Sequence, residues 1–256
     1  MSGRIVALMY HDVSDGTAGG FPTLTVSPGR FEQHLRWLCR MKVQTITPRQ
    51  YSEARAGRAR LPSRAVILTF DDAYAALTRM ALPAMKKLGF TAAIYVVSSE
   101  INGINRWDLD RGSAPIPLMS AEEISYWSRQ GFEFGAHSRF HSDLTRLSDE
   151  DVEDELAGSK SVLEQLTPYP VTSFAYPYGA VDDRVAAAAR RHFNTAFTTL
   201  EGTNTDATDA LRLRRTSIAS REFSLEFLSR TIFGKNVLRV PRSIAGRAKR
   251  LVVGRL

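Results

Sequence analysis

The sequence predicts an α/β protein with a mainly parallel sheet. Short apolar runs alternate with amphipathic stretches along the chain, the pattern of strands that alternate with helices. Carboxylates or histidines directly follow two of the apolar runs, and active sites of parallel α/β folds collect at that end of the strands. With 256 residues, of which 43% are hydrophobic, the chain can bury a core without disulfides or a structural metal. We therefore expect any metal in this protein to be functional.

Six apolar runs are the predicted strands of this sheet. They are Ile5–Tyr10, Ala65–Phe70, Thr91–Val97, Phe132–Gly135, Thr172–Ala175 and Thr195–Thr198. Two stretches rich in glycine and proline interrupt the alternation, Asp12–Thr25 and Asn102–Pro117. Loops of this length commonly carry binding residues.

Three predicted helices begin at capping signals. Ser27 is an N-cap before a proline at the first helical position, Pro28. Ser120 and Glu123 have the spacing of a capping box. Ser148 precedes three acidic residues that complement the dipole of the helix they begin.

The net charge of +7 is concentrated at one end of the chain. Residues 235–256 hold seven lysines and arginines and no acidic residue, so residues 1–234 are formally neutral. A nucleic-acid-binding domain needs its positive face on the folded body, so we expect no nucleic-acid partner. The sequence predicts one domain over 1–234 and a basic amphipathic tail over 235–256. The tail would lie either on an anionic membrane or against the domain or another subunit. In the last case the protein would be an oligomer.

Cysteine usage and hydropathy bear on the compartment. The only cysteine, Cys39, cannot form an internal disulfide, which favours a reducing compartment. The first ten residues lack the features of a secretory signal peptide, and no stretch is long and apolar enough to span a bilayer. We expect a cytoplasmic protein, with peripheral contact at the inner membrane face if the tail binds lipid.

Three motifs follow predicted strands. Asp71 and Asp72 end one strand; such a pair suits catalysis but also occurs in solvated turns. His137 and His141 would meet on one side of a helical turn and, with one carboxylate, could form a catalytic zinc site; structural histidines are the alternative. The turn Tyr176-Pro177-Tyr178-Gly179 could aim a backbone N–H at an oxyanion or simply pack on the core.

Taken together and in this order, the motifs Thr69-Phe70-Asp71-Asp72, His137-Ser138-x-x-His141 and Tyr176-Pro177-Tyr178-Gly179 resemble the signature motifs of NodB-type polysaccharide deacetylases, a carbohydrate esterase family. The resemblance spans residues 5–218. It implies a distorted (β/α) barrel that binds a divalent metal, usually zinc. It also implies that Asp71 is the general base, that Asp72, His137 and His141 are the metal ligands, and that Tyr178 supplies the oxyanion N–H.

The chain departs from the usual family pattern in its general acid. Most members carry a late histidine, but no histidine follows His192 in this sequence. Tyr10-His11 resembles the opening motif of the branch that acts on poly-N-acetylglucosamine, in which a histidine at the end of the first strand replaces the late one. First and last strands are neighbours in a closed barrel, so we expect His11 to be the acid. The alternatives, His34 and His192, look structural.

A second departure is Ala175, which stands where many relatives carry an arginine that holds the catalytic aspartate. We expect Arg215 to take over that role from a neighbouring strand; a solvated surface arginine is the alternative. In the loop before Pro117, Trp107 is a candidate for stacking on a sugar, because aromatic rings present an apolar face. Tyr176 is a further candidate for orienting the substrate.

These observations predict a zinc-dependent deacetylase that removes N-acetyl groups from N-acetylhexosamine units of a polysaccharide or its lipid-linked precursor. A metal ion lowers the pKa of a water molecule to about 7, so that a carboxylate can take its proton. Two alternatives remain open. One is a zinc amidase that acts on peptidoglycan or a small amide. The other is a non-catalytic carbohydrate-binding barrel whose departures from the pattern mark an inactive site.

Overall fold

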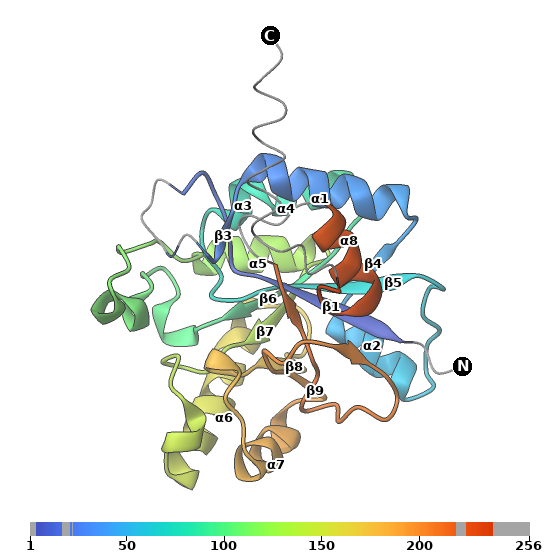
Figure 1. The fold of residues 1–256 in the computed structure, drawn as a ribbon. Helices are drawn as coiled ribbons and strands as arrows, with labels where there is room; N and C mark the ends of the chain where they lie inside the picture. Colours follow the sequence, from blue (N-terminus) through green and yellow to red (C-terminus); the bar gives the residue numbers. More distant parts are fainter. Residues whose placement is uncertain (1–3, 17–20, 22, 219–223, 238–256) are drawn as a thin grey trace.

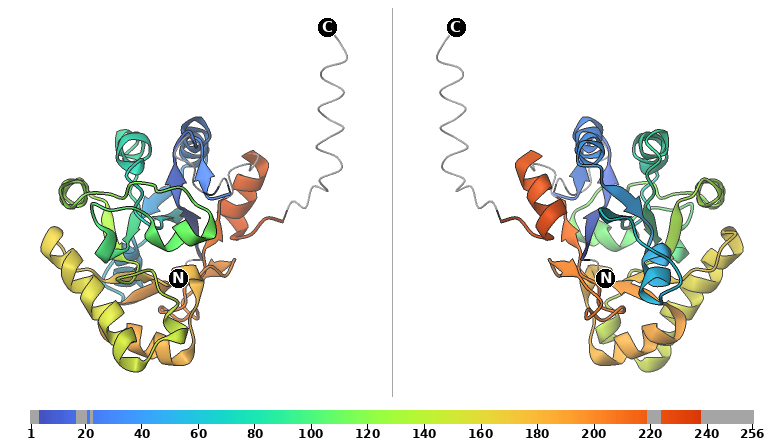
Figure 2. Two further views of the ribbon diagram at one scale, coloured as in Figure 1. Left: turned by 90° about the vertical axis from the view of Figure 1, so that its left-hand side faces the viewer. Right: turned by 90° about the vertical axis from the view of Figure 1, so that its right-hand side faces the viewer.

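The main sheet is nine-stranded and curls into a distorted barrel (Figures 1 and 2). The computed structural model describes residues 4–16, 21, 23–218 and 224–237. The strand order is β10-β1-β5-β6-β7-β8-β9, with β4 also paired to β5 and β11 to β1. The strands of this sheet are β1 (Ile5–Tyr10), β4 (Gln44–Ile46), β5 (Ala65–Phe70), β6 (Ala93–Val96), β7 (Glu133–Ala136), β8 (Ser173–Ala175), β9 (Thr195–Phe197), β10 (Thr203–Asn204) and β11 (Thr216–Ser217). A separate parallel pair joins β2 (Asp12–Val13) to β3 (Thr25–Val26).

Helices cover the outside of the curled sheet (Figure 2). The α-helices are α1 (Pro28–Arg40), α2 (Pro48–Arg55), α3 (Leu77–Met80), α4 (Leu82–Lys87), α5 (Ala121–Arg129), α6 (Asp149–Leu166), α7 (Asp183–His192) and α8 (Ser224–Phe233). Short 3₁₀ turns are η1 (Ser98–Glu100), η2 (Arg106–Arg111), η3 (Leu144–Arg146) and η4 (Pro177–Gly179). Strands that alternate with outer helices are what the sequence pattern predicts.

The segment after β9 closes the barrel, because it contacts both β9 and β1. Phe197 at the end of β9 forms a parallel bridge with Leu213, and Leu8 in β1 pairs in parallel with Thr216. The chain between Leu213 and Thr216 therefore runs from one edge strand to the first strand. Residues near 213–216 therefore lie beside β1, although they are far from it in the sequence. His11, directly after β1, can thus occupy the position expected of a late histidine.

Alternation along the strands separates two apolar layers. Val6 and Leu8 of β1 belong to the large layer between sheet and helices, whereas Ile5 and Ala7 belong to a smaller cluster within the barrel. Successive side chains of a strand point to opposite faces, which explains this division. Inside the barrel, Gly135 leaves room for Tyr95, because a Cβ there would lie 2.4 Å from the tyrosine ring.

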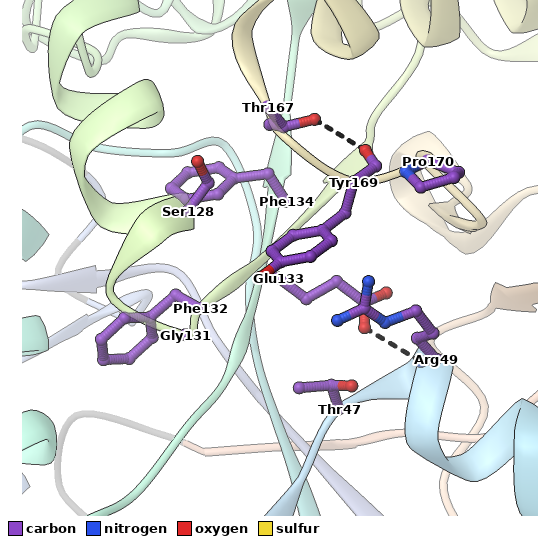
Figure 3. A pocket seen from close by; sticks show the side chains of 10 residues that line it. All are labelled: Thr47, Arg49, Ser128, Gly131, Phe132, Glu133, Phe134, Thr167, Tyr169 and Pro170. Atoms are coloured by element: carbon purple, nitrogen blue, oxygen red, sulfur yellow. Dashed lines mark hydrogen bonds between the residues drawn. The ribbon is translucent and has the colours of Figure 1, made fainter.

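A small polar pocket lies near the amino ends of β7 and β8 (Figure 3). Glu133 Oε2 accepts a hydrogen bond of 2.9 Å from the Arg49 N–H, and Oε1 accepts one of 2.7 Å from Ser173 Oγ. The Arg49 guanidinium lies 4.5 Å from the centre of the Tyr169 ring. The carboxylate is occupied by donors of the protein itself, consistent with a stabilising role at this end of the barrel.

The predicted strands all form, with ends shifted by at most two residues, whereas the very short strands β2, β3, β4, β10 and β11 were not predicted. The capping box of Ser120 and Glu123 is present, and Ser148 Oγ accepts from the Asp151 N–H. Ser27 is the N-cap of α1 but makes no side-chain capping bond. In the described part of the chain, no helix is long and apolar enough to cross a membrane. Residues 238–256 lie outside the described residues, so the predicted tail remains a prediction.

Candidate active site

One pocket of about 280 Å³ lies at the carboxyl ends of the parallel strands. Its wall includes His11 after β1, Asp71 and Asp72 after β5, and His137 after β7. Loop residues complete it on the other sides: Phe21, Leu24, Trp107, Asp108, Arg111, His141 and Tyr178. Residues from five separate stretches of the sequence thus converge where parallel α/β folds place their active sites.

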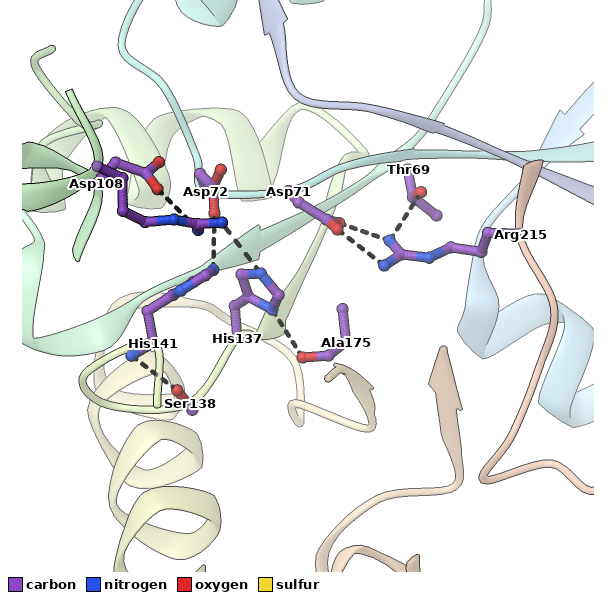
Figure 4. Close-up of polar contacts among 10 residues, drawn as sticks. Thr69, Asp71, Asp72, Asp108, His137, Ser138, His141, Ala175 and Arg215 are labelled. Carbon is purple, nitrogen blue, oxygen red and sulfur yellow. Dashed lines mark hydrogen bonds and ion pairs between the residues drawn. The ribbon is translucent and has the colours of Figure 1, made fainter. Parts of the chain in front are cut away.

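Asp72, His137 and His141 bring three ligand atoms together (Figure 4). Asp72 Oδ1 lies 3.6 Å from His137 Nε2 and 3.5 Å from His141 Nε2. These distances are long for hydrogen bonds. In a tetrahedral zinc site with bonds of about 2.0–2.1 Å, ligand atoms are about 3.4 Å apart. The two Asp72–histidine separations therefore match those of atoms that share one cation, and all three ligand atoms lie within 4.8 Å of one another.

The protonation states of the triad also suit a cation. His137 Nδ1 lies 2.7 Å from the Ala175 carbonyl oxygen, which can only accept, so Nε2 carries the free lone pair. Burial lowers the pKa of His137 and lowers that of His141 well below the usual value, which keeps both rings neutral. Burial and the neighbouring Asp71 raise the pKa of Asp72 well above its ordinary range, and its Oδ1 has no hydrogen-bond partner among the described residues. A divalent metal would supply the missing positive charge, so these residues fit it.

The segment from His137 to His141 is not a helical turn, so the predicted helical geometry of the two histidines was wrong. Ser138 and His141 adopt φ values of 62° and 60°, in the left-handed region, and the chain turns sharply after β7. Ser138 Oγ accepts a 3.0 Å hydrogen bond from the His141 N–H and stabilises the turn. Asp72, at φ 70°, is similarly bent. Backbone strain of this kind collects at functional sites.

Arg215 reaches Asp71 from the segment that closes the barrel. Its Nη1 lies 2.5 Å from Asp71 Oδ1 and its Nη2 2.8 Å from Oδ2, a bidentate pair with both side chains buried (Figure 4). Arg215 also donates to Thr69 Oγ1 and to the Thr198 carbonyl. Burial alone would raise the pKa of Asp71, but the Arg215 guanidinium, with smaller contributions from His137 and His11, brings the pKa down to about 2. Asp71 is therefore ionised at neutral pH.

His11 is the histidine that lines the pocket besides the two of the triad. Burial lowers its pKa to about 4, although the charge of Asp71 opposes that shift. The alternatives lie elsewhere. His34 is buried, 3.0 Å from the Tyr10 hydroxyl, and stacks on Phe227 with ring centres 4.1 Å apart. His192 ends α7 and pairs with Glu153 at 2.5 Å.

The turn after β8 brings two tyrosines to the pocket wall, Tyr176 buried and Tyr178 exposed. The Tyr176 ring is fully buried, and its hydroxyl donates to the Leu211 carbonyl at 3.0 Å, so it orients the turn and cannot offer that hydroxyl to a ligand. Tyr178 is exposed and has φ 60°. No acceptor for its N–H is found among the described residues. An unpaired N–H on the pocket wall is what an oxyanion donor requires.

Trp107 contacts a predicted metal ligand directly. Its ring stacks on His141, with centres 4.6 Å apart and planes inclined by 16°, and the edge of Tyr178 meets the same imidazole at 4.7 Å. One face of Trp107 is thus already covered, so its first role is to support His141. Beside it lies Arg111, which no motif in the sequence indicated; its guanidinium is 3.3 Å from Asp108 and 5.3 Å from the Tyr178 ring centre.

Comparison with known proteins agrees with this arrangement. The family model described as polysaccharide deacetylase matches residues 58–196, more than half of the chain. The Bacillus subtilis protein YxkH, whose name assigns it provisionally to the polysaccharide deacetylases, is 26% identical over 188 residues, which are 73% of this chain and 61% of the relative. A Staphylococcus epidermidis poly-β-1,6-N-acetyl-D-glucosamine N-deacetylase is 22% identical over 203 residues, 78% of this chain and 70% of the relative.

Solved structures show the same fold. BC0361, a polysaccharide deacetylase from Bacillus cereus, superposes with a TM-score of 0.76 at 26% identity, over 90% of this chain and 69% of that one. IcaB from Ammonifex degensii gives a TM-score of 0.75 at 21% identity, over 92% of this chain and 98% of that one. The distorted barrel expected from the sequence is thereby confirmed. The chain spans only about three fifths of the length of the Bacillus subtilis relative.

Proposed function

The chain belongs to the polysaccharide deacetylase family, and on that premise we propose that it hydrolyses the N-acetyl amide bonds of N-acetylhexosamine units in a glycan. The observation that carries the proposal is the juxtaposition of the buried Asp71–Arg215 pair with the triad of Asp72, His137 and His141 in one pocket. A passive sugar-binding surface has no use for such a charge arrangement. The reaction consumes water and releases acetate and a free amine.

The triad of Asp72, His137 and His141 would hold a divalent cation, for which zinc suits the one-carboxylate, two-imidazole donor set. Such an ion acts as a Lewis acid that polarises a carbonyl and makes water acidic enough to lose a proton near neutral pH. The Asp71 carboxylate takes a proton from the water that attacks the acetamide carbon. Arg215 holds both oxygens of Asp71, so the carboxylate keeps one orientation during the attack.

The Tyr178 N–H donates to the acetamide oxygen as negative charge develops on it. His11 passes a proton to the sugar nitrogen, which leaves as an amine. Because its pKa is about 4, His11 is neutral in the resting protein at pH 7. It must therefore gain its proton during the reaction. Asp71 lines the same pocket and is the group that takes a proton from water, so it is the proposed source.

The proposed substrate is a glycan of N-acetylglucosamine type or its lipid-linked precursor. Support comes from the Staphylococcus epidermidis relative, named for poly-β-1,6-N-acetyl-D-glucosamine, and from the Tyr10-His11 motif at the end of β1. We also propose that the enzyme works in the cytoplasm, where the tail would lie either on the membrane surface or against the domain or another subunit.

The test is acetate release from N-acetylglucosamine oligomers, measured before chelation, after chelation and after zinc is added back. Release that chelation abolishes and zinc restores is the expected result. If the protein binds stoichiometric metal but releases acetate only from peptidoglycan fragments or a small acetamide, the substrate proposal is wrong. If it binds no metal, it is a non-catalytic barrel.

A further inference from the structure

The two histidines of the triad are held in different ways. His137 is fixed through its ring, because Nδ1 bonds the Ala175 carbonyl, and through its N–H, which donates to the Val96 carbonyl at 2.9 Å. The Nδ1 of His141 is buried and has no hydrogen-bond partner among the described residues. Metal-bound histidines usually take their orientation from a partner on the second ring nitrogen. The position of His141 must therefore come from its backbone and from the rings that pack on it.

A single carboxylate organises the backbone that leads to His141. Glu155, in the middle of α6 and 4% exposed, accepts at Oε2 from the N–H groups of Arg139 and Phe140 at 2.7 and 3.1 Å. Its Oε1 accepts from Ser142 Oγ at 3.2 Å. Successive N–H groups in a chain that passes through the left-handed region form a concave anion site. Here the anion is a side chain of the protein.

The other side of the same loop is held by η1. The carbonyl oxygens of Ser138 and Arg139 accept from the N–H groups of Ser98 and Ser99 at 3.2 and 3.0 Å. The Arg139 side chain crosses α6 at Gly158, where a Cβ would lie 2.6 Å from Arg139 Cδ. The N–H groups of Arg139 and Phe140 are therefore satisfied by α6, and the carbonyls of Ser138 and Arg139 by η1, which leaves this part of the loop little freedom.

We propose that Glu155 is a positioning residue of the metal centre: by fixing residues 138–142 it keeps His141 Nε2 within reach of Asp72 Oδ1. This inference rests on the proposed function, because it assigns the cation to the triad. Glu155 touches neither cation nor substrate. Without its carboxylate, two part-buried N–H groups lose their acceptor and the loop relaxes. Residues that orient metal ligands typically change metal affinity by about 10- to 100-fold when removed.

The test measures zinc affinity by competition with a chromophoric chelator, and the visible spectrum of the cobalt-loaded protein. Glu155→Leu should weaken zinc binding by about 10- to 100-fold and alter the cobalt spectrum. Glu155→Gln retains a carbonyl oxygen that can accept both N–H groups, so it should stay within about threefold of wild type. The control is Glu164→Leu on the same helix, where Glu164 accepts the Val171 N–H at 3.0 Å away from the metal loop; its zinc affinity should not change.

Wild-type zinc affinity in Glu155→Leu would overturn the inference, and so would equal weakening in the Glu164→Leu control. Should Glu155→Leu fail to fold, Ser142→Ala removes one donor to Glu155 and is expected to weaken zinc binding by a few-fold; unchanged affinity there would contradict us. The outcomes separate this inference from the proposed function. A wild type that binds zinc through the triad but releases no acetate refutes the deacetylase and leaves the role of Glu155 intact.

Discussion

Arg215 and Asp71 form a buried bidentate ion pair although 144 residues separate them in the sequence. Arg215 lies in the segment that runs from β9 to β1, so closing the barrel also places a cation beside the proposed base. The family resemblance implies an arginine partner for this carboxylate at the position of Ala175, and here a guanidinium from the closing segment holds both carboxylate oxygens.

Arg215→Met should shift the pH dependence of the reaction. Arg215 is the largest of the charges that hold the pKa of Asp71 at about 2 against the effect of burial, so without it that pKa rises. Asp71 must be ionised to act as a base. The acidic limb of the kcat/KM profile should therefore move to higher pH. An unchanged profile would show that Arg215 does not control the base.

The same pair should make stability depend on pH. The folded pKa of Asp71 is lower than the value of about 3.9 expected in the unfolded chain, so the ionised carboxylate favours the fold. The contribution is complete above about pH 4 and is lost as the pH falls through about 2. The difference in Tm between wild type and Arg215→Met should thus shrink between pH 5 and pH 2. A difference that is constant over this range would contradict the ion-pair account.

His11→Ala should lower kcat by about 10²- to 10⁴-fold, the usual contribution of a general acid, and should leave metal content unchanged. His192→Ala is the matched control, because His192 pairs with Glu153 at the end of α7, outside the pocket. Steady-state kinetics of both variants decide the matter. If the two variants retain similar activity, another group protonates the leaving amine.

His137→Ala should lose the cation, since the triad would keep two of its three ligand atoms. Metal content after gel filtration, measured by elemental analysis, is expected to fall well below one per chain. The His192→Ala protein should retain a full equivalent. Stoichiometric metal in His137→Ala would place the cation at other residues.

Trp107→Ala should weaken metal binding modestly. The ring lies flat on His141, and aromatic contacts of this type contribute about 0.5–1.5 kcal/mol, which corresponds to roughly 2- to 13-fold in affinity. Trp107→Phe preserves a stacking ring and serves as the control. A chelator competition that gives equal affinities for wild type and Trp107→Ala would restrict Trp107 to contact with the glycan.

Much of the fold and of the site could be predicted because the signals are local. The strand β5 and the pair Asp71-Asp72 are adjacent in sequence, so the apolar run indicates where the carboxylates lie. Helix α5 begins at Ser120, as its capping box predicts. Strands of two residues, such as β11, carry no periodicity of their own and form only because β1 offers them an open edge.

The parts that escaped prediction depend on tertiary structure. The four-residue spacing of His137 and His141 predicts a helical turn. The actual backbone is left-handed at Ser138 and His141, because contacts with α6 and η1 determine its path. Glu155 lies among the acids of an ordinary amphipathic helix, with nothing in its neighbourhood to indicate two N–H partners from the metal loop. Arg215, by contrast, could be proposed from the sequence, because a segment that follows the sixth predicted strand can reach the site from a neighbouring strand.

The most direct test of the account compares wild type with Asp71→Asn, both loaded with zinc, in one assay of acetate release from N-acetylglucosamine oligomers. Asparagine keeps the shape of the side chain but cannot take a proton from water, and the triad is untouched. The account predicts one equivalent of zinc in each protein, acetate release by wild type, and a loss of at least about 10²-fold in the variant. Equal acetate release by the two zinc-loaded proteins would contradict it.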